Sequence, residues 1–240
     1  MKLIINADDF GLSKSISDGI VDGIKNGYIT STSIMANMEY AEYAIKEAIK
    51  NNIDCIGLHI NLTVGMPVIE NNNLIDENGL FLYNRKQIEN SKLTYKDAYN
   101  EIIAQINRVE EYSNGLIKID HLDMHHHLSD NENIKRATID VANKYNIPIR
   151  NMFDCDISKP DVLYDKFTIK SVSITSLEKM ISEYKAKDIV VELMTHPGYI
   201  DDYTRILTSY IERDKELQVL KEAKENGIFD KIELINFKQI

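Results

Sequence analysis

The sequence predicts an α/β fold in which parallel strands form a barrel or distorted barrel covered by helices. Short apolar runs rich in β-branched residues alternate about seven times with longer segments that have helical periodicity. The chain has 240 residues, 43% of them hydrophobic, which suits one barrel domain. It contains no GxGxxG fingerprint, which would have favoured a dinucleotide-binding sheet. We therefore expect a single domain over residues 1–240.

The expected strands and helices follow one another along the whole chain. The first helix is typical, because Ile16, Ile20 and Ile24 share one face and Gly27 lies near its end. Strands are expected at residues 3–7, 32–37, 55–62, 119–126, 148–153, 188–194 and 231–237. Helices are expected at 13–28, 41–52, 95–115, 131–146, 176–185 and around 209–227.

Two long segments interrupt this alternation. Residues 64–93 follow the third predicted strand, and residues 153–173 follow the fifth. Loops of this length in a compact domain are usually functional or disordered, and both would lie on the face where barrel enzymes build their sites. We expect residues 64–93 to form a lid or an oligomer contact, with Phe81 and Tyr83 available to stack on a sugar ring.

Composition excludes several classes of partner. The formal net charge is -10 and no basic stripe is present, which argues against nucleic acid and against anionic membranes. No apolar run approaches the ~20 residues of a membrane span. The first residues lead directly into an acidic pair and are too short for a signal sequence. Cys55 and Cys155 form no CxxC pattern, so we expect two thiols, a cytoplasmic location, and an oligomeric state that the sequence leaves open.

All six histidines belong to polar clusters in or just after predicted strands. Asp8 and Asp9 follow the first strand, His59 lies in the third, "HLDMHHHLSD" at 121–130 holds four histidines, and His196 follows the sixth. Each cluster by itself has an ordinary explanation. The two aspartates could cap a helix, His59 could be a core histidine, the three consecutive histidines could be an exposed tract, and the segment at His196 could be a turn. Because the carboxyl ends of parallel strands meet on one face, the clusters should converge. Imidazole and carboxylate groups suit a divalent metal, so we expect a metal-dependent hydrolytic site.

Strand periodicity divides the histidine-rich run into two faces. The odd-numbered residues from His121 to His127 share one face, and the even-numbered residues share the other. Leu122 and Met124 are apolar, so the odd-numbered set should point into the barrel mouth, and His126 should point away. Periodicity does not choose between His125 and His127.

Five motifs together resemble the YdjC/ChbG family of carbohydrate deacetylases. They are "NADDFGLS" at 6–13, "TSTSIMAN" at 30–37, "GLHINLT" at 57–63, "HLDMHHHL" at 121–128 and "THPGYID" at 195–201. These motifs span nearly the whole chain in the family's order and spacing. The resemblance implies a NodB-like distorted (β/α) barrel, which agrees with the alternation described above.

The resemblance also implies roles for individual residues. Asp9, His59 and His125 match the metal ligands of the family, and the match selects His125 over His127. Asp8 matches the general base and His196 matches the general acid. The family is commonly described with Mg²⁺, so one Mg²⁺ ion is expected first. By ligand softness, two nitrogens and a carboxylate also suit Zn²⁺, Co²⁺ or Ni²⁺.

Four further residues are expected to bind substrate: Asn37, His127, Arg150 and Tyr199. Arg150 has two alternative explanations, as a residue that orients an acid or as an ordinary surface arginine. The family often reads "HLDSHHHVH", whereas this chain has Met124 in place of the serine and Ser129 in place of the last histidine. This chain therefore lacks the side chain that would make any substrate contact of that histidine.

The expected reaction is removal of N-acetyl groups from amino sugars, with acetylated chitooligosaccharides such as diacetylchitobiose as substrates. Three alternatives remain. The protein could deacylate another acylated sugar or a glycolipid, or it could be a metal-dependent phosphoesterase on the same scaffold. The third is a sugar-binding protein without activity, against which the presence of Asp8 and His196 argues.

Overall fold

The computed structural model describes residues 1–70, 73–82, 88 and 91–240. Within these residues seven parallel strands form one curled sheet, in the order β4-β3-β2-β1-β6-β5, with β7 paired to β1 as well. The strands are β1 (Lys2–Phe10), β2 (Ser31–Ile34), β3 (Ile56–Ile60), β4 (Leu122–Met124), β5 (Val162–Tyr164), β6 (Val190–Thr195) and β7 (Glu233–Leu234).

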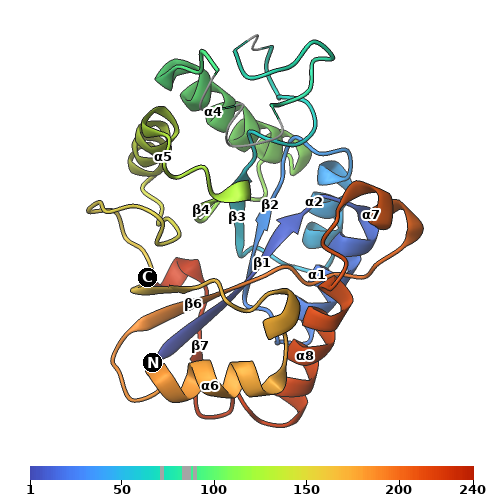
Figure 1. Cartoon of the computed structure of the whole chain (residues 1–240), viewed down its shortest axis with the longest axis vertical. Helices are drawn as coiled ribbons and strands as arrows, with labels where there is room; N and C mark the ends of the chain where they lie inside the picture. The colour runs from blue at the N-terminus through green and yellow to red at the C-terminus, as the bar shows by residue number, and fades with distance from the viewer. Residues whose placement is uncertain (71–72, 83–87, 89–90) are drawn as a thin grey trace.

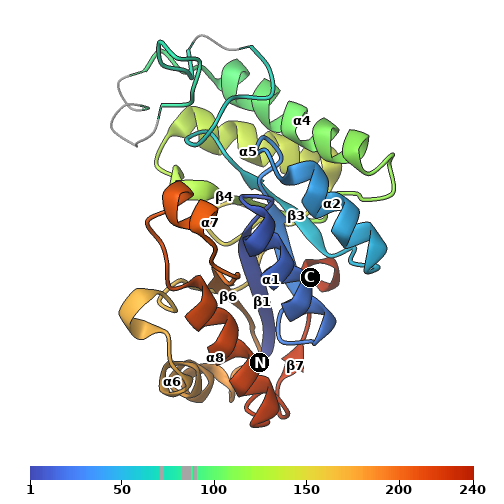
Figure 2. The ribbon, with the colours of Figure 1, turned by 90° about the vertical axis from the view of Figure 1, so that its right-hand side faces the viewer.

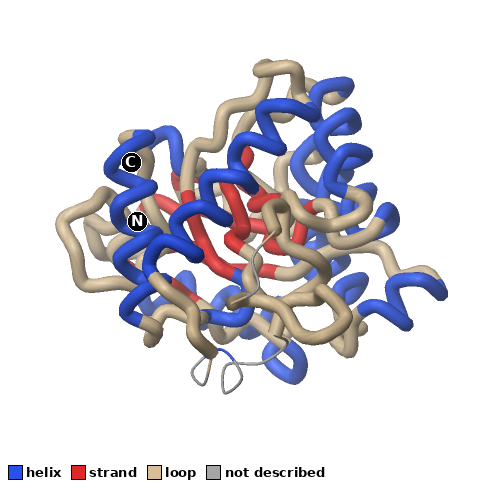
Figure 3. Tube along the Cα trace, turned by 90° about the horizontal axis from the view of Figure 1, so that it is seen from above, coloured by secondary structure: helices blue, strands red, loops and turns tan. Residues whose placement is uncertain are grey.

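Helices surround the curled sheet, with the strands in the middle of the molecule (Figure 3). They are α1 (Lys14–Lys25), α2 (Ala41–Lys50), α4 (Tyr95–Tyr112), α5 (Glu132–Tyr145), α6 (Ile174–Tyr184), α7 (Asp202–Leu207) and α8 (Arg213–Glu225). In Figures 1 and 2, α4 and α5 lie side by side at one end of the molecule, and α6 and α8 lie at the other. This is the distorted, open form of barrel that the alternation predicted.

Local capping explains where several helices begin and end. Ser13 caps α1, because its side chain accepts a hydrogen bond from the backbone N–H of Ile16. Thr94 and Asp97 form a capping box at the start of α4. At the end of α5, Asn146 adopts the left-handed conformation, with φ 52°, that terminates a helix.

The central strand β1 carries two acids to the carboxyl edge of the sheet. Its residue Ala7 is in register with Thr195 of β6 on one side and with Thr32 of β2 on the other. The pairing with β2 then shifts between Ala7 and Phe10, and Asp9 has a φ of 69°. In a regular strand adjacent side chains point to opposite faces. This irregularity explains how two successive aspartates can line the same cavity.

The fifth strand is not where the sequence predicted it. Residues 148–153 contribute only an isolated bridge, between Ile149 and Leu122. After Arg150 the chain turns sharply, because the N–H of Met152 donates to the carbonyl of Arg150. β5 instead lies within residues 153–173, which were expected to be a loop. The short helix α7 was also missed.

The segment 64–93 corrects one expectation about substrate contacts. Phe81 is 3% exposed and forms an antiparallel bridge with Ile75, so it packs in the core and cannot stack on a sugar. Tyr83 lies outside the described residues, and the lid or oligomer role of the segment stays a prediction.

The two cysteines are free thiols, as expected, although only Cys55 is buried and Cys155 is half-buried. In the part of the chain that the structure describes, no helix has both the length and the apolar character needed to cross a membrane.

Candidate active site

A cavity of about 510 Å³ opens at the carboxyl ends of the strands. It lies where the sequence analysis expected the polar clusters to converge. Its polar lining includes Asp8, Asp9, His59, His125, His126, His127, His196 and Arg213. Five of the six histidines therefore share one cavity with two aspartates.

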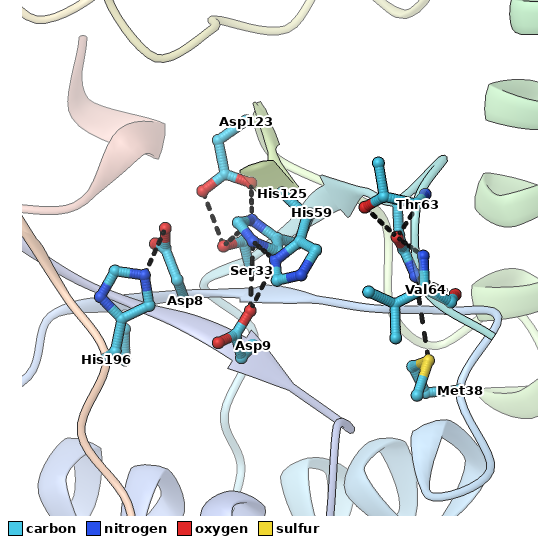
Figure 4. Close-up of polar contacts among 12 residues, drawn as sticks. Asp8, Asp9, Ser33, Met38, His59, Thr63, Val64, Asp123, His125 and His196 are labelled. Atoms are coloured by element: carbon cyan, nitrogen blue, oxygen red, sulfur yellow. Dashed lines mark hydrogen bonds and ion pairs between the residues drawn. The ribbon is translucent and has the colours of Figure 1, made fainter. Parts of the chain in front are cut away.

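Three side chains in this cavity point their ligand atoms at one another (Figure 4). Asp9 Oδ1 lies 3.3 Å from His59 Nε2 and 3.1 Å from His125 Nδ1. The two nitrogens are 3.2 Å apart. These separations suit atoms that each lie about 2.0–2.2 Å from a shared ion. Asp9 Oδ1 is buried and has no partner with hydrogen-bond geometry among the described residues, as expected of a metal ligand.

Asp123 fixes the orientation of the His59 ring. Its Oδ1 lies 2.8 Å from His59 Nδ1, and its Oδ2 accepts a hydrogen bond of 2.7 Å from Ser33 Oγ. The carboxylate only accepts, so Nδ1 carries a hydrogen, and in the neutral ring that a metal ion requires the Nε2 lone pair faces Asp9 and His125. Burial alone would lower the pKa of His59, but Asp123 and Asp8 raise it to about 10. The surroundings therefore strongly favour positive charge at this position.

Asp8 is held by a two-point ion pair. Arg150 Nη1 donates to Asp8 Oδ2 at 2.8 Å, and Arg150 Nη2 donates to Asp8 Oδ1 at 2.7 Å. Burial by itself raises the pKa of Asp8, but Arg150 lowers it below its usual value. Asp8 is therefore ionised near neutral pH and able to accept a proton.

Arg150 does not contact the cavity. Its side chain is fully buried, and its guanidinium also pairs with Asp123 at 3.0 Å and with Glu192 at 2.7 Å. The expectation that Arg150 binds substrate is therefore wrong for this structure, whereas the alternative, that it orients an acid, describes its position. Asp8, His59 and Asp123 form a second group with metal-ligand spacing, but both of its carboxylates are already paired with the Arg150 guanidinium.

His196 lies opposite Asp8 (Figure 4), with its Nε2 3.9 Å from Asp8 Oδ2. Its backbone N–H donates to Glu216 Oε2 at 2.6 Å, which ties the loop after β6 to α8. Burial lowers the pKa of His196 to about 4 and raises the pKa of Glu216 to about 7. Tyr210 donates its hydroxyl hydrogen to Glu216 and completes this support.

The three consecutive histidines do not continue the strand. β4 ends at Met124, and residues His125–His127 form a single 3₁₀ turn, with φ 58° at His126 and 47° at His127. Strand alternation therefore stops, and all three side chains line the cavity. The expectation that His126 points away is wrong: it is exposed and stacks on His125 with ring centroids 3.9 Å apart. Burial lowers the pKa of the half-buried His127.

His121 was expected to point into the barrel mouth, and this is also wrong. Its ring is buried against Phe237, with centroids 3.7 Å apart, and its Nδ1 lies 2.6 Å from Asp120 Oδ1. His121 precedes β4 and so lies toward the opposite end of the sheet. A Cβ at Gly57 would come within 2.3 Å of the His121 ring, so the ring needs that glycine. Its place in the histidine-rich run reflects packing.

Of the expected substrate contacts, His127 lines the cavity, and Asn37 and Tyr199 do not. The Asn37 amide donates to the carbonyl of Val64 at 2.9 Å, and its oxygen accepts from Asn61 at 2.8 Å. Asn37 therefore supports the segment after β3. Tyr199 is 45% exposed, and its backbone N–H donates to Ser15 at the start of α1.

Sequence reasoning assigned no role to five residues that shape the site: Asp123, Glu192, Tyr210, Arg213 and Glu216. Asp123 could have been predicted from the sequence, because it belongs to the histidine-rich motif and lies on the face of the predicted strand that also carries His125. The others carry no local signal: Glu192 and Arg213 pair with residues far along the chain, and Tyr210 and Glu216 support the loop that carries His196.

A family model described as YdjC-like protein matches residues 2–226. The chain belongs to this YdjC-like family. Two relatives match over their full length and that of this chain, both named carbohydrate deacetylase: one from Clostridium beijerinckii (34% identical) and one from Listeria monocytogenes (33% identical). The expected family is thereby confirmed.

Solved structures confirm the fold of this YdjC-like protein. A crystal structure from Enterococcus faecalis V583, described as a proposed cellobiose-phosphate cleavage protein, is 28% identical with a TM-score of 0.89 and covers 99% of this chain and 98% of its own. The peptidoglycan deacetylase PdaC from Bacillus subtilis is 12% identical with a TM-score of 0.52, covering 99% of this chain and 88% of its own. At that identity the likeness concerns the fold alone, and it agrees with the expected NodB-like barrel.

Proposed function

We propose that this YdjC-like protein is a metal-dependent carbohydrate deacetylase that hydrolyses the N-acetyl group of an amino sugar. One observation carries the proposal: Asp8 and His196 face each other in the cavity that also holds the cluster of Asp9, His59 and His125. The names of the C. beijerinckii and L. monocytogenes relatives support the reaction. Acetylated chitooligosaccharides such as diacetylchitobiose are the substrates we propose first.

Asp9, His59 and His125 would hold one divalent ion, with Mg²⁺ first by family resemblance and Zn²⁺, Co²⁺ or Ni²⁺ as alternatives. When bound, such an ion lowers the pKa of water and polarises a carbonyl oxygen. Asp9 Oδ1 is buried and accepts no hydrogen bond from a described residue, and Asp123 and Asp8 raise the pKa of His59 against the effect of burial. Both observations support a cation at this position.

Asp8 acts as the general base in this proposal. It takes a proton from the water that attacks the acetamide carbonyl, because Arg150 keeps its carboxylate ionised and fixed. His196 protonates the leaving amine, which would otherwise depart too slowly. Burial lowers the pKa of His196 to about 4, so the ring is neutral in the free protein. In this proposal it gains the proton that Asp8 took from the water, across the 3.9 Å between Asp8 Oδ2 and His196 Nε2, and passes it to the amine.

A phosphorylated sugar is a second candidate substrate. The similar crystal structure from E. faecalis is described as that of a proposed cellobiose-phosphate cleavage protein. Arg205 lines the cavity, and among the residues that the structure describes no acidic side chain pairs with it. Arg205 could therefore meet a phosphate group, either on a sugar that is deacetylated or in the phosphoesterase alternative. A glycolipid or other acylated sugar also remains a candidate.

One assay separates these candidates. Metal-free protein and protein reloaded with Mg²⁺, Zn²⁺, Co²⁺ or Ni²⁺ are incubated with diacetylchitobiose and with its phosphorylated form, and acetate and inorganic phosphate are both measured. We expect acetate release by reloaded protein and loss of activity with a chelator. Acetate release at the same rate with and without chelator would contradict the metal site. Release of phosphate without acetate would favour the phosphoesterase alternative.

We also propose that the protein works in the cytoplasm without a nucleic-acid or membrane partner. Whether it acts as a homo-oligomer is best answered by light scattering on the purified protein.

A further inference from the structure

Arg213 reaches the proposed metal cluster from α8, a part of the chain that no motif marked as functional. Its Nη2 donates to Asp9 Oδ2 at 2.6 Å, and the two side chains are 3% and 1% exposed. The other carboxylate oxygen, Oδ1, faces His59 and His125. The two oxygens of Asp9 therefore have separate partners, one a fixed guanidinium and the other the two imidazoles.

This division determines how many oxygens Asp9 can offer to an ion. A carboxylate oxygen held in a charge-assisted hydrogen bond is a poorer metal ligand, because the donor occupies one of its lone pairs, so Asp9 offers an ion mainly Oδ1. Small ions such as Zn²⁺ and Mg²⁺ bind single oxygens at about 2.0–2.2 Å. Ca²⁺ takes about 6–8 oxygens at about 2.3–2.6 Å and often uses both oxygens of a carboxylate. A clamp on Oδ2 therefore disfavours the larger ion more than the smaller ones.

We propose that Arg213 is a positioning residue that confines Asp9 to one-oxygen coordination and so makes the site select small divalent ions over large ones. This inference rests on the proposed metal site at Asp9, His59 and His125. The clamp is a buried ion pair, because the Arg213 guanidinium lies 2.6 Å from Asp9 Oδ2.

Arg213 also contacts the loop that carries His196. Its Nη1 lies 3.5 Å from the His196 carbonyl, and its own carbonyl accepts the N–H of Gly198 at 3.2 Å. A change at Arg213 therefore disturbs the general acid as well, and a loss of activity would not separate the two effects. Equilibrium binding of two ions to the metal-free protein does separate them. Both ions carry the same charge, so the loss of the guanidinium charge largely cancels in the ratio of their affinities.

The test compares Zn²⁺ and Ca²⁺ binding by calorimetry for the native protein, Arg213→Met and Arg213→Lys. Met has similar length and no donor, so we expect the preference for Zn²⁺ over Ca²⁺ to fall about tenfold, the scale of a lost outer contact to a metal ligand. Lys keeps the charge but not the forked geometry, so we expect a smaller fall, roughly threefold. If the Met variant does not fold, the Lys variant still provides the test.

Lys221→Gln is the matched control, since it removes an exposed positive charge from the same helix, where Lys221 lies 4.0 Å from Glu225. It should keep the native ratio. Native ratios in both Arg213 variants, or no detectable Ca²⁺ binding by any of them, would overturn the inference. A native protein that binds no Zn²⁺ would instead remove the proposed metal site itself.

Discussion

Asp123→Asn should switch the tautomer of a proposed metal ligand. Three donors converge on Asp123 Oδ2: Ser33 Oγ at 2.7 Å, Arg150 Nη2 at 3.0 Å and Asn6 Nδ2 at 3.3 Å. In the variant the amide oxygen must take this position, because an NH₂ group there would face three donors. The amide NH₂ then occupies the Oδ1 position, 2.8 Å from His59 Nδ1. His59 must accept on Nδ1 and carry its hydrogen on Nε2, the atom that faces Asp9.

The size of the effect follows from this switch. Loss of a hydrogen-bond partner behind a metal-ligating histidine lowers metal affinity by about 10–100-fold, or roughly 1.4–2.7 kcal/mol. To bind an ion, His59 would have to return its hydrogen to Nδ1, where it would face the amide hydrogens of the variant. That arrangement loses a buried hydrogen bond, worth roughly 1–3 kcal/mol. We therefore expect a loss near the upper end of the range, about 100-fold.

Calorimetric titration of metal-free protein measures this affinity, and nitrogen-15 NMR of the imidazoles reports the tautomer. Asp120→Asn is a matched control, because Asp120 pairs with His121 Nδ1 at 2.6 Å toward the opposite end of the sheet. The control should bind metal like the native protein. Native affinity in Asp123→Asn, or equal losses in the two variants, would refute the tautomer argument.

Three other predictions follow from the same structure. Asp8→Asn keeps the shape of the base but removes its proton acceptor, so kcat should fall by about 10²–10⁴-fold. Calorimetry should show that the variant still binds metal, and a loss of metal binding would instead make Asp8 a metal ligand. Burial raises the pKa of Glu216 from 4.5 to about 7, so native stability should fall as pH rises between these values. The free energy of unfolding in urea should fall by up to about 3 kcal/mol by pH 8 in the native protein, and Glu216→Gln should abolish that fall. An unchanged dependence of the unfolding free energy on pH in the variant would contradict this. Burial raises the pKa of Cys55 to about 11, so a thiol reagent should label Cys155 first by mass spectrometry; equal rates would contradict the packing.

The alternation of strands and helices could be predicted because it is written in neighbouring residues. Six of the seven strands in the described residues show as short apolar runs, and the longer helices show a 3.6-residue period, so these elements and the parallel sheet followed from local pattern. The prediction failed where local pattern and sheet pairing disagree. Residues 148–153 look like a strand, yet they form only one bridge at Ile149, whereas the less typical Val162–Tyr164 pairs with β6. Strand pairing depends on which edge is free, and sequence neighbours do not encode that.

The sequence by itself determined which side chains could meet. Parallel strands end on one face, so the polar clusters were expected to converge, and the family resemblance selected Asp9, His59 and His125 within them. The structure brings the ligand atoms of these three residues within 3.3 Å of one another. The sequence could not foresee the turn at residues 125–127, because positive φ angles at His126 and His127 end the alternation on which the face assignment depended.

Only the tertiary structure decided what holds these side chains in place. Arg150 is 142 residues from Asp8, and Arg213 is 204 residues from Asp9. An arginine looks the same in sequence whether it is solvated on the surface or buried against an acid. Its role becomes visible only when the order of the strands brings distant segments together, because the ion pair is made by proximity in space and leaves no periodicity in the chain.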